Sequence, residues 1–297
     1  MQIGFIGLGR MGKNMVFHLL EKKHSVVVYD RSTTPIKELE SKGATGAYSM
    51  GELVGNLHSP RVLWMMITAG KPIDEVVHTL APLLSKGDTI IDGGNSFYKD
   101  SQRRAKSLMK MGIHFLDVGT SGGIEGARHG ACMMIGGSQA AFKKTERLYR
   151  DMCVKGGYGY MGTSGAGHFV KMVHNGIEYG MMGAIAEGLQ VIEKHSKEFS
   201  IDFLKAAEVY EHGSIVESRL MSWTVSAMKR KGFASIAGTV PQGETEEEMK
   251  KLEKLSTMPI LRQSRLGRAA TRKHPSIAGK LIAGMRNEFG GHRVLGP

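Results

Sequence analysis

The chain has 297 residues, of which 41% are hydrophobic and 23% are charged. This composition describes a globular protein that can bury a sizeable core, in one large or two ordinary domains. The net charge of +12 favours anionic partners. Because the basic residues are spread along the chain without interleaved aromatic residues, we expect no nucleic-acid partner. A phosphorylated metabolite is the better candidate, and solubility is the plainer explanation of the charge.

Two features argue against export and against membranes. Cys132 and Cys153 are the only cysteines, too few for a disulfide framework. The N-terminus enters a strand pattern at once, without the basic segment and long apolar run of a signal peptide. The longest apolar run, Val62–Ile67, is far too short to span a membrane. We therefore expect a cytoplasmic protein with no membrane partner.

The first motif stands at the start of the chain. Ile3–Ile6 suits a buried parallel strand, and glycines follow it as G-x-G-x-x-G where a helical pattern begins. In a dinucleotide-binding turn such glycines permit the tight turn, the approach of a pyrophosphate and the packing of helix on strand. An unrelated strand–helix turn is the alternative. The residues expected to hold a dinucleotide here are Gly7, Leu8, Gly9, Arg10, Met11 and Gly12.

The second strand pattern, Ser25–Asp30, ends in an acidic residue about 20 residues beyond the glycines. A carboxylate at this place accepts hydrogen bonds from the ribose hydroxyls of NAD and repels a 2′-phosphate. Arg31 could stack on adenine or pair with such a phosphate. We therefore expect NAD to be preferred and NADP to remain possible, with Asp30, Arg31 and Ser32 binding the cofactor.

Further strand-like runs alternate with helical patterns over the first half of the chain. They lie at residues 61–67, 89–92, 113–118, 131–135 and 158–161.

The alternation predicts a Rossmann-type, doubly wound parallel sheet, an α/β domain over residues 1–163. Because ligands bind beyond the carboxyl ends of such strands, Asn95 and Ser121–Gly123 should lie at the edge of the glycine-rich turn. Ordinary turns are the alternative for each. After residue 163 strand signals nearly stop, which predicts an all-α domain over residues 164–297.

The all-α domain begins with Gly165–His195, which lacks proline and could form a helix about 45 Å long. Lys171, His174, Asn175 and Glu178 stand at i, i+3, i+4 and i+7, a polar stripe on an otherwise apolar helix. Because unpaired burial of such groups is costly, we expect the stripe to line a cleft with a polar occupant. A solvated helix face is the alternative.

Five stretches of the chain match a known family. The most specific is KMVHNGIEYG, Lys171–Gly180; the others are Gly4–Gly12, Ile90–Asp100, Gly119–Gly137 and Arg286–His292. With these stretches the chain resembles the decarboxylating 6-phosphogluconate dehydrogenases in their shorter bacterial form. Related 3-hydroxyacid dehydrogenases of the same superfamily do not, as a rule, carry the histidine and glutamate of the first stretch.

The resemblance implies oxidation and decarboxylation of 6-phosphogluconate to ribulose 5-phosphate and CO₂, a step of the pentose phosphate pathway. It makes Lys171 the general base on the C3 hydroxyl and Glu178 the acid that protonates C1. It implies no metal, and the chain contains no metal-binding motif. The implied substrate contacts are Asn95, Ser121, Gly122, Gly123, His174, Asn175 and Tyr179, and the residues beside the nicotinamide are Ile67, Thr68, Ala69 and Asn95.

The C-terminal stretch implies an assembly. In the family, the equivalents of Arg286 and His292 reach into the active site of a partner subunit, and Arg286 would hold the substrate phosphate. This makes the second domain a substrate-binding and dimerisation domain with a C-terminal tail. We expect a homodimer or a tetramer of this chain.

Two departures from the family pattern concern the phosphate. Glu217 stands where longer members carry a phosphate-binding arginine, and Ile236–Thr245 lacks a clear copy of a family loop. Phosphate binding could instead draw on Arg262, Arg265 or Arg268. An NAD(P)-dependent 3-hydroxyacid dehydrogenase without decarboxylation and a non-catalytic dinucleotide sensor are therefore the alternatives.

Overall fold

The computed structural model describes residues 1–243 and 245–296. Glu244, in the loop Ile236–Thr245, and Pro297, at the end of the chain, lie outside the described residues. The chain divides into two units, Met1–Met172 and Val173–Pro297.

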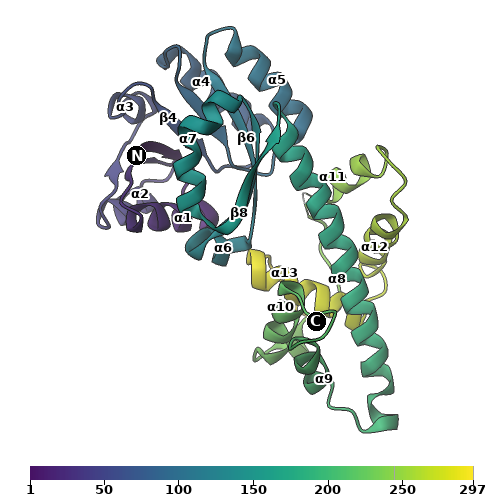
Figure 1. The fold of residues 1–297 in the computed structure, drawn as a ribbon. Coiled ribbons are helices and arrows are strands. Elements are labelled where there is room, and N and C mark those ends of the chain that lie inside the picture. Colours follow the sequence, from purple (N-terminus) through teal and green to yellow (C-terminus); the bar gives the residue numbers. More distant parts are fainter. Residues whose placement is uncertain (244, 297) are drawn as a thin grey trace. The chain divides into compact units, whose positions relative to one another are not determined.

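The first unit is built on one eight-stranded sheet with strand order β3-β2-β1-β4-β5-β6-β7-β8 (Figure 1). The strands are β1 (Gln2–Ile6), β2 (Ser25–Tyr29), β3 (Thr45–Gly46), β4 (Val62–Met65), β5 (Thr89–Asp92), β6 (His114–Ser121), β7 (Ala131–Gly137) and β8 (Cys153–Gly162).

Strands β1 to β6 run parallel in the order 3-2-1-4-5-6, which confirms the Rossmann-type sheet. Strand β7 is antiparallel to β6, and β8 is parallel to β7, so the sheet is mostly parallel. Only residues 122–130 separate β6 from β7. Because a parallel crossover needs about a dozen residues or more, this connection can only return the chain in the opposite direction.

Helices cover both faces of the sheet (Figure 1). They are α1 (Arg10–Glu21), α2 (Thr33–Glu40), α3 (Met50–Gly55), α4 (Lys71–Leu80), a short 3₁₀ turn (Ala81–Leu83), α5 (Tyr98–Met109), α6 (Gly123–His129) and α7 (Gln139–Met152).

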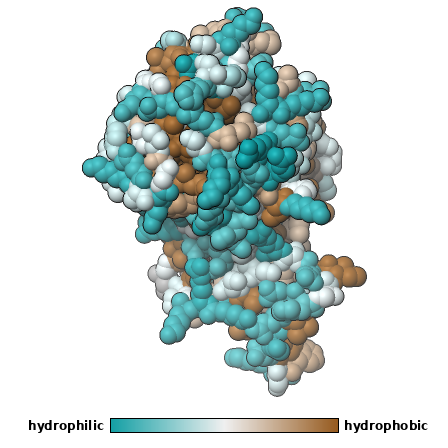
Figure 2. Space-filling model, turned by 60° about the vertical axis from the view of Figure 1, so that its left-hand side comes forward, coloured by the Kyte–Doolittle hydropathy of each residue, from teal (hydrophilic) through white to brown (hydrophobic). Residues whose placement is uncertain are grey.

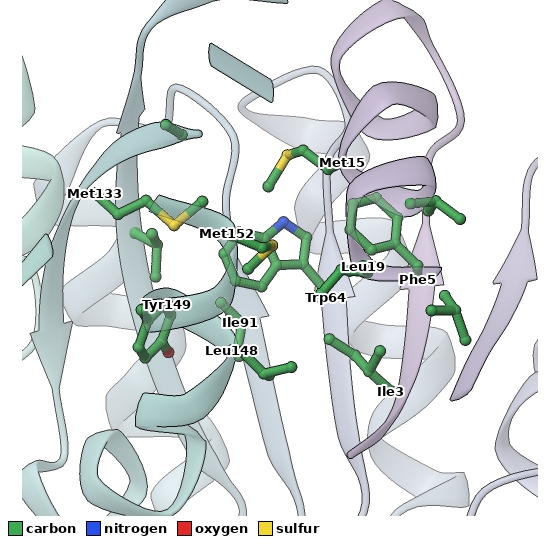
Figure 3. Close-up of a cluster of buried hydrophobic side chains, with 14 of the residues drawn as sticks. Ile3, Phe5, Met15, Leu19, Trp64, Ile91, Met133, Leu148, Tyr149 and Met152 are labelled. Carbon is green, nitrogen blue, oxygen red and sulfur yellow. The ribbon is translucent and has the colours of Figure 1, made fainter. Parts of the chain in front are cut away.

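Each face of the sheet has its own apolar layer. On the face covered by α1, α2 and α7, the fully buried Trp64 of β4 stacks on Phe5 of β1, with ring centroids 6.2 Å apart (Figure 3). On the other face, Leu63 and Ile90 pack beneath α3, α4 and α5. Burial of the strands from both sides explains why they are continuous apolar runs in the sequence.

The second unit is helical, and residues 173–243 and 245–296 contain no strand. Its apolar core joins α8, α9, α10 and α13, with Met182, Leu220 and Leu281 buried. The all-α prediction is confirmed. The helices are α8 (Ala166–Phe199), which starts in the first unit, α9 (Phe203–Tyr210), α10 (Arg219–Lys229), a 3₁₀ turn (Phe233–Ser235), α11 (Thr245–Leu252), α12 (Pro259–Ala270) and α13 (Ile277–Gly290).

Two hydrogen bonds involve the residues that follow α13 at the end of the chain. Helix α13 includes Asn287, whose amide Nδ2 donates to the carbonyl of His292 at 2.8 Å. The N–H of Ala237 donates to the carbonyl of Leu295 at 2.8 Å. These bonds hold the last residues against their own unit.

The surface is mostly hydrophilic, with scattered hydrophobic groups on the face seen in Figure 2. Among the described residues, no helix is long and apolar enough to cross a lipid bilayer.

Candidate active site

The glycine-rich turn after β1 has the geometry of a dinucleotide cradle. Gly7 has φ +93, and a Cβ there would collide with the carbonyl of Met66. A Cβ on Gly12 would collide with the carbonyl of Gly7, whereas a Cβ on Gly9 would meet nothing within 4 Å. The first and third glycines are therefore required by packing, and the second faces open space at the start of α1. This arrangement fits a pyrophosphate approaching the backbone.

Asp30 supports this turn directly. Its Oδ2 accepts the N–H of Leu8 at 2.7 Å and its Oδ1 accepts the N–H of Ser32 at 2.9 Å. The carboxylate thus braces the glycine-rich turn and the start of α2 at the same time. The sequence motif predicts a ribose ligand at this place but gives no sign of the bracing role.

The loops after β4 and β5 are held by Arg104 of α5, which is 2% exposed. Its Nη2 donates to the carbonyl of Gly70 at 3.0 Å, and its Nε donates to Asp74 at 2.7 Å. Its Nη1 lies 3.5 Å from a carboxylate oxygen of Asp92 and from the Oγ of Ser96. One guanidinium therefore ties both loops together, and we call these five residues the Arg104 network.

The Arg104 network holds the loops that carry the residues predicted to lie beside the nicotinamide. The residues Ile67, Thr68 and Ala69 precede Gly70, and Asn95 precedes Ser96. Asp92, which is fully buried, also accepts the N–H of Gly94 at 3.2 Å and the hydroxyl of Ser96 at 2.7 Å. The sequence gives no pattern that singles out Arg104, because its partners lie up to 34 residues away.

Lys171 packs against β6. A Cβ added to Gly119 would collide with the Cβ of Lys171 and would lie 2.9 Å from its Cγ. Further along, Gly122 and Gly123 have φ values of +115 and +63, which favour glycine over other residues. Ser121, the last residue of β6, is half-buried beside this turn. Lys171 therefore packs on the strand that ends at the predicted Ser121–Gly123 turn.

The remaining residues of the polar stripe belong to the second unit. His174 Nδ1 lies 3.3 Å from Asn175 Oδ1 and 3.9 Å from Glu178 Oε2. The side chain of Glu178 is 25% exposed and that of His174 is 36% exposed. The group is half-buried, rather than a fully solvated helix face.

Next along α8, Tyr179 is covered by a buried arginine. The guanidinium carbon of Arg268 lies 3.4 Å from the centroid of the Tyr179 ring, and its Nη2 lies 3.1 Å from the sulfur of Met182. Among the described residues, its buried Nε has no hydrogen-bond partner. Burial, with a smaller effect of the neighbouring Arg286, lowers the pKa of Arg268 to about 10, so the group is still a cation at pH 7.

Arg286 of α13 is the second arginine of this group. Its Nη1 donates to the carbonyl of Pro241 at 2.8 Å. Burial lowers its pKa, and the charges of Tyr179 and Glu178 oppose that shift. The hydroxyl of Tyr179 lies 3.0 Å from that of Thr245, a residue that the motifs do not identify. We call Arg268 and Arg286 the arginine pair.

Other arginines of the second unit already have carboxylate partners. Arg265 forms two hydrogen bonds to Glu253, and Arg272 forms two to Glu246. Arg262 is exposed. Of the three arginines proposed to replace the family's phosphate ligand, Arg268 is thus the one that is buried, and it lies against Tyr179 and Met182.

Two predicted features lie elsewhere in the second unit. Glu217 lies in the exposed turn between α9 and α10, where its carboxylate accepts the N–H of Gly213 at 2.7 Å. His292 is exposed, with its ring 6.0 Å from that of Phe289. The described residues contain no group of three or more side chains that could hold a metal ion.

Family models match both units of the chain. The model for the NAD binding domain of 6-phosphogluconate dehydrogenase matches residues 2–162, and the model for its C-terminal domain matches residues 167–232. YqeC of Bacillus subtilis, provisionally named a 6-phosphogluconate dehydrogenase, is 45% identical over 98% of both chains. This chain belongs to the 6-phosphogluconate dehydrogenase family.

The NAD(+)-dependent, decarboxylating 6-phosphogluconate dehydrogenase of Haloferax volcanii also matches this chain over nearly all of its length. It is 34% identical over 99% of this chain and 98% of its own. Longer relatives match in part: the enzyme of Schizosaccharomyces pombe is 44% identical over 64% of this chain and 41% of its own.

Solved structures agree with this assignment. The 6-phosphogluconate dehydrogenase of Plasmodium falciparum matches with a TM-score of 0.82 and 29% identity, over 91% of this chain and 62% of its own. The 3-hydroxyisobutyrate dehydrogenase of Mycobacterium tuberculosis matches with a TM-score of 0.73 at 19% identity, over 96% and 99% of the two chains. The second likeness shows a shared fold alone.

The Arg104 network predicts a large difference between two neighbouring arginines. Arg104→Met leaves the buried carboxylate of Asp92 without its cation and should lower the free energy of unfolding by about 3–5 kcal/mol. Arg103→Met removes an exposed partner of the same Asp74 and should cost about 0.2–1 kcal/mol. Chemical denaturation measures both values. Equal losses would show that the buried contacts of Arg104 do not hold the loops.

Proposed function

We propose that this enzyme oxidises and decarboxylates 6-phosphogluconate to ribulose 5-phosphate and CO₂, with reduction of a nicotinamide dinucleotide. The observation that carries the proposal is the arginine pair beside Glu178 and Tyr179. Arg268 is buried and Arg286 is half-buried, and a terminal phosphate would supply an anion to both cations. A small 3-hydroxy acid has no second anion to place there. The named activities of the Haloferax and Plasmodium relatives support the same substrate.

The dinucleotide is held by the glycine-rich turn, and the open space at Gly9 fits its pyrophosphate. When bound, its nicotinamide ring accepts the hydride from C3 of the sugar acid. The Arg104 network keeps the loops carrying Ile67–Ala69 and Asn95 in place for that ring. We assign the ribose end to Asp30, Arg31 and Ser32.

Lys171 is the general base of this mechanism. In its neutral form it removes the proton from the C3 hydroxyl as the hydride leaves C3. The resulting β-keto acid loses CO₂, and the protonated lysine then stabilises the negative charge that develops on the C3 oxygen. Ser121, Gly122 and Gly123, at the end of the strand against which Lys171 packs, bind the acid end of the substrate.

Glu178 is the general acid. It stands seven residues after Lys171 on the continuous helix α8, so the two groups share a helix face about 10 Å apart along the axis. They can therefore serve different carbons of one sugar, and Glu178 donates its proton to C1 of the enediol. His174 and Asn175, which contact each other beside Glu178, bind substrate hydroxyls.

The phosphate is bound by the arginine pair together with Tyr179 and Thr245. The guanidinium of Arg268 lies against an aromatic ring, that of Tyr179, and a thioether, that of Met182. Both are weak partners for a guanidinium compared with phosphate oxygens. With the phosphate bound by the arginine pair, no arginine is needed at the position of Glu217, which lies in an exposed turn.

We also propose that NAD is preferred to NADP and that the enzyme is a cytoplasmic homodimer. The carboxylate of Asp30, fixed by two N–H groups, would face a 2′-phosphate with a like charge. The two cysteines are free thiols, as in a reducing compartment. The exposed side of α8 carries an apolar seam with spacings of four and three residues, as in paired helices, made of Ile177, Met181, Ala184, Gly188 and Val191.

In this dimer the last residues need not be exchanged for phosphate binding. Arg286 already lies beside Tyr179 of its own chain, and the segment that carries His292 is bonded to Asn287. The exchange of Arg286 and His292 between subunits, which the family resemblance implies, would then strengthen the dimer rather than create the phosphate site.

The first prediction concerns the base. Lys171→Met keeps the aliphatic stem that packs on Gly119 but has no proton acceptor, so turnover should fall by at least about 10²–10⁴-fold. Dinucleotide binding, measured by calorimetry, should be unchanged. Lys197→Met, on an exposed position of the same helix, is the matched control and should retain activity. Wild-type turnover in Lys171→Met would exclude the lysine as base.

The second prediction concerns the phosphate. Arg268→Met should lower kcat/KM for 6-phosphogluconate by about 10–100-fold, the loss expected for a charge-assisted hydrogen bond. The much weaker reaction with gluconate, which has no phosphate, should be unaffected. Arg262→Met, an exposed change on the same helix, is the control. A similar loss with both substrates would show that Arg268 supports the fold and does not read the phosphate.

The third prediction concerns cofactor choice. Asp30→Asn leaves one oxygen to brace the turn but removes the charge, so both cofactors should bind more weakly. NAD should lose more than NADP, and the ratio of their kcat/KM values should move towards NADP by about tenfold, or ~1.4 kcal/mol. An unchanged ratio would mean that Asp30 braces the turn without reading the ribose.

A further inference from the structure

Helix α8 starts in an unusual way for a helix that carries a catalytic base. The residue before Ala166 is Gly165, which has φ +92 and no side chain that could accept an N–H of the first turn. The usual N-cap side chain of serine, threonine or aspartate is therefore missing at this helix start. Another part of the chain has to satisfy these N–H groups, because Gly165, Gly167 and His168 are buried.

Asp117 of β6 supplies the cap from a distance of 48 residues in the sequence. Its Oδ1 accepts the N–H of Gly165 at 2.7 Å and its Oδ2 accepts the N–H of His168 at 3.0 Å. A capping box satisfies the same two N–H groups with two local side chains. Here one carboxylate does both, and its charge is also favourable at the positive end of the helix dipole.

The carboxylate and the helix start depend on each other. Asp117 is 0% exposed, and a buried carboxylate is stable only where donors surround it. The close approach requires glycine on both sides. A Cβ on Gly167 would collide with the carbonyl of Asp117, and a Cβ on Gly136 would lie 2.8 Å from both carboxylate oxygens. The first turn of α8 is thus seated on the backbones of β6 and β7.

The stem of the catalytic lysine, Lys171, packs on the same face of β6 as Asp117. Side chains alternate along a strand, so Asp117, Gly119 and Ser121 of β6 share one face. Asp117 caps the helix, Gly119 leaves room for the stem of Lys171, and Ser121 ends the strand at the proposed substrate site. Lys171 is three residues beyond the capped His168, slightly less than one helical turn.

We propose that Asp117 is a positioning residue for Lys171. By fixing the rotation and the axial position of the first turn of α8, it sets where the lysine stem crosses β6. Nothing in the mechanism above uses Asp117, and it touches neither substrate nor cofactor there. The inference rests on the proposed role of Lys171 as general base.

The test is Asp117→Asn, which keeps the size of the side chain but places an NH₂ group against one of the two N–H donors. A displacement of about 1 Å at a reacting group can cost about 100-fold, so kcat should fall to that extent while KM for NAD is unchanged. Hydrogen exchange of the amides in residues 163–170 should become faster. Both measurements are made on the full-length enzyme at a temperature where it stays folded.

Ser101→Ala is the matched control. It removes the buried hydrogen bond of 2.7 Å between Ser101 Oγ and His168 Nδ1 in the same turn but leaves both backbone bonds to Asp117. It should lower stability and leave kcat unchanged. An equal fall of kcat in both variants would show that any loosening of the turn suffices, and wild-type kcat in Asp117→Asn would also overturn the proposal.

A second variant, Gly119→Ala, tests the position of Lys171 if Asp117→Asn does not fold. Gly119→Ala pushes a methyl group into the stem of Lys171 and should lower kcat with NAD binding retained; unchanged kcat would overturn the placement. A wild-type enzyme without turnover of 6-phosphogluconate would contradict the proposed function instead. In that case the hydrogen-exchange comparison still decides whether Asp117 holds the first turn.

Discussion

The buried contact between the carboxylate of Asp117 and the first turn of α8 is the constraint on which the proposed position of Lys171 depends. That helix carries Lys171, the proposed base, three residues beyond the capped His168. A carboxylate buried in a sheet is costly by itself, and an uncapped helix start is costly by itself. Together they offset each other, which is why the helix begins at this place and in this register. The glycines at 119, 136 and 167 are required because any side chain there would separate helix and strands.

The arginines of the second unit differ in whether they pair with carboxylates of the same unit. Many cations of the second unit are neutralised within the fold, as in the double hydrogen bonds of Arg265 to Glu253 and of Arg272 to Glu246. The arginine pair is different, because Arg268 is buried against an aromatic ring and a thioether and lies near a second cation. In the proposed function, the phosphate of the substrate would add an anion to this group of two cations.

Local patterns in the sequence were sufficient for the sheet and for the dinucleotide turn. The roles of Gly7, Gly9 and Gly12 depend on residues within one strand–turn–helix unit, so their spacing predicts the structure. The reversal at β7 could have been predicted from the short connection after β6, which leaves too few residues for a crossover. The supports of the site could not, because Arg104, Asp117 and Arg268 act on partners that are 34, 48 and 86 residues away in the sequence. A helix that starts at Gly165 has no local side chain to cap it, and this feature could have suggested a distant partner.

The measurement that tests the account most directly is the stoichiometry of the reaction. The enzyme is mixed with 6-phosphogluconate and NAD, reduced nicotinamide is followed in the near ultraviolet, and released CO₂ is trapped from the same sample. The account predicts one CO₂ for each reduced nicotinamide, since Lys171 and Glu178 complete the steps before and after decarboxylation. Reduced nicotinamide without CO₂ would contradict it and would assign the chain to the 3-hydroxyacid dehydrogenases that share its fold.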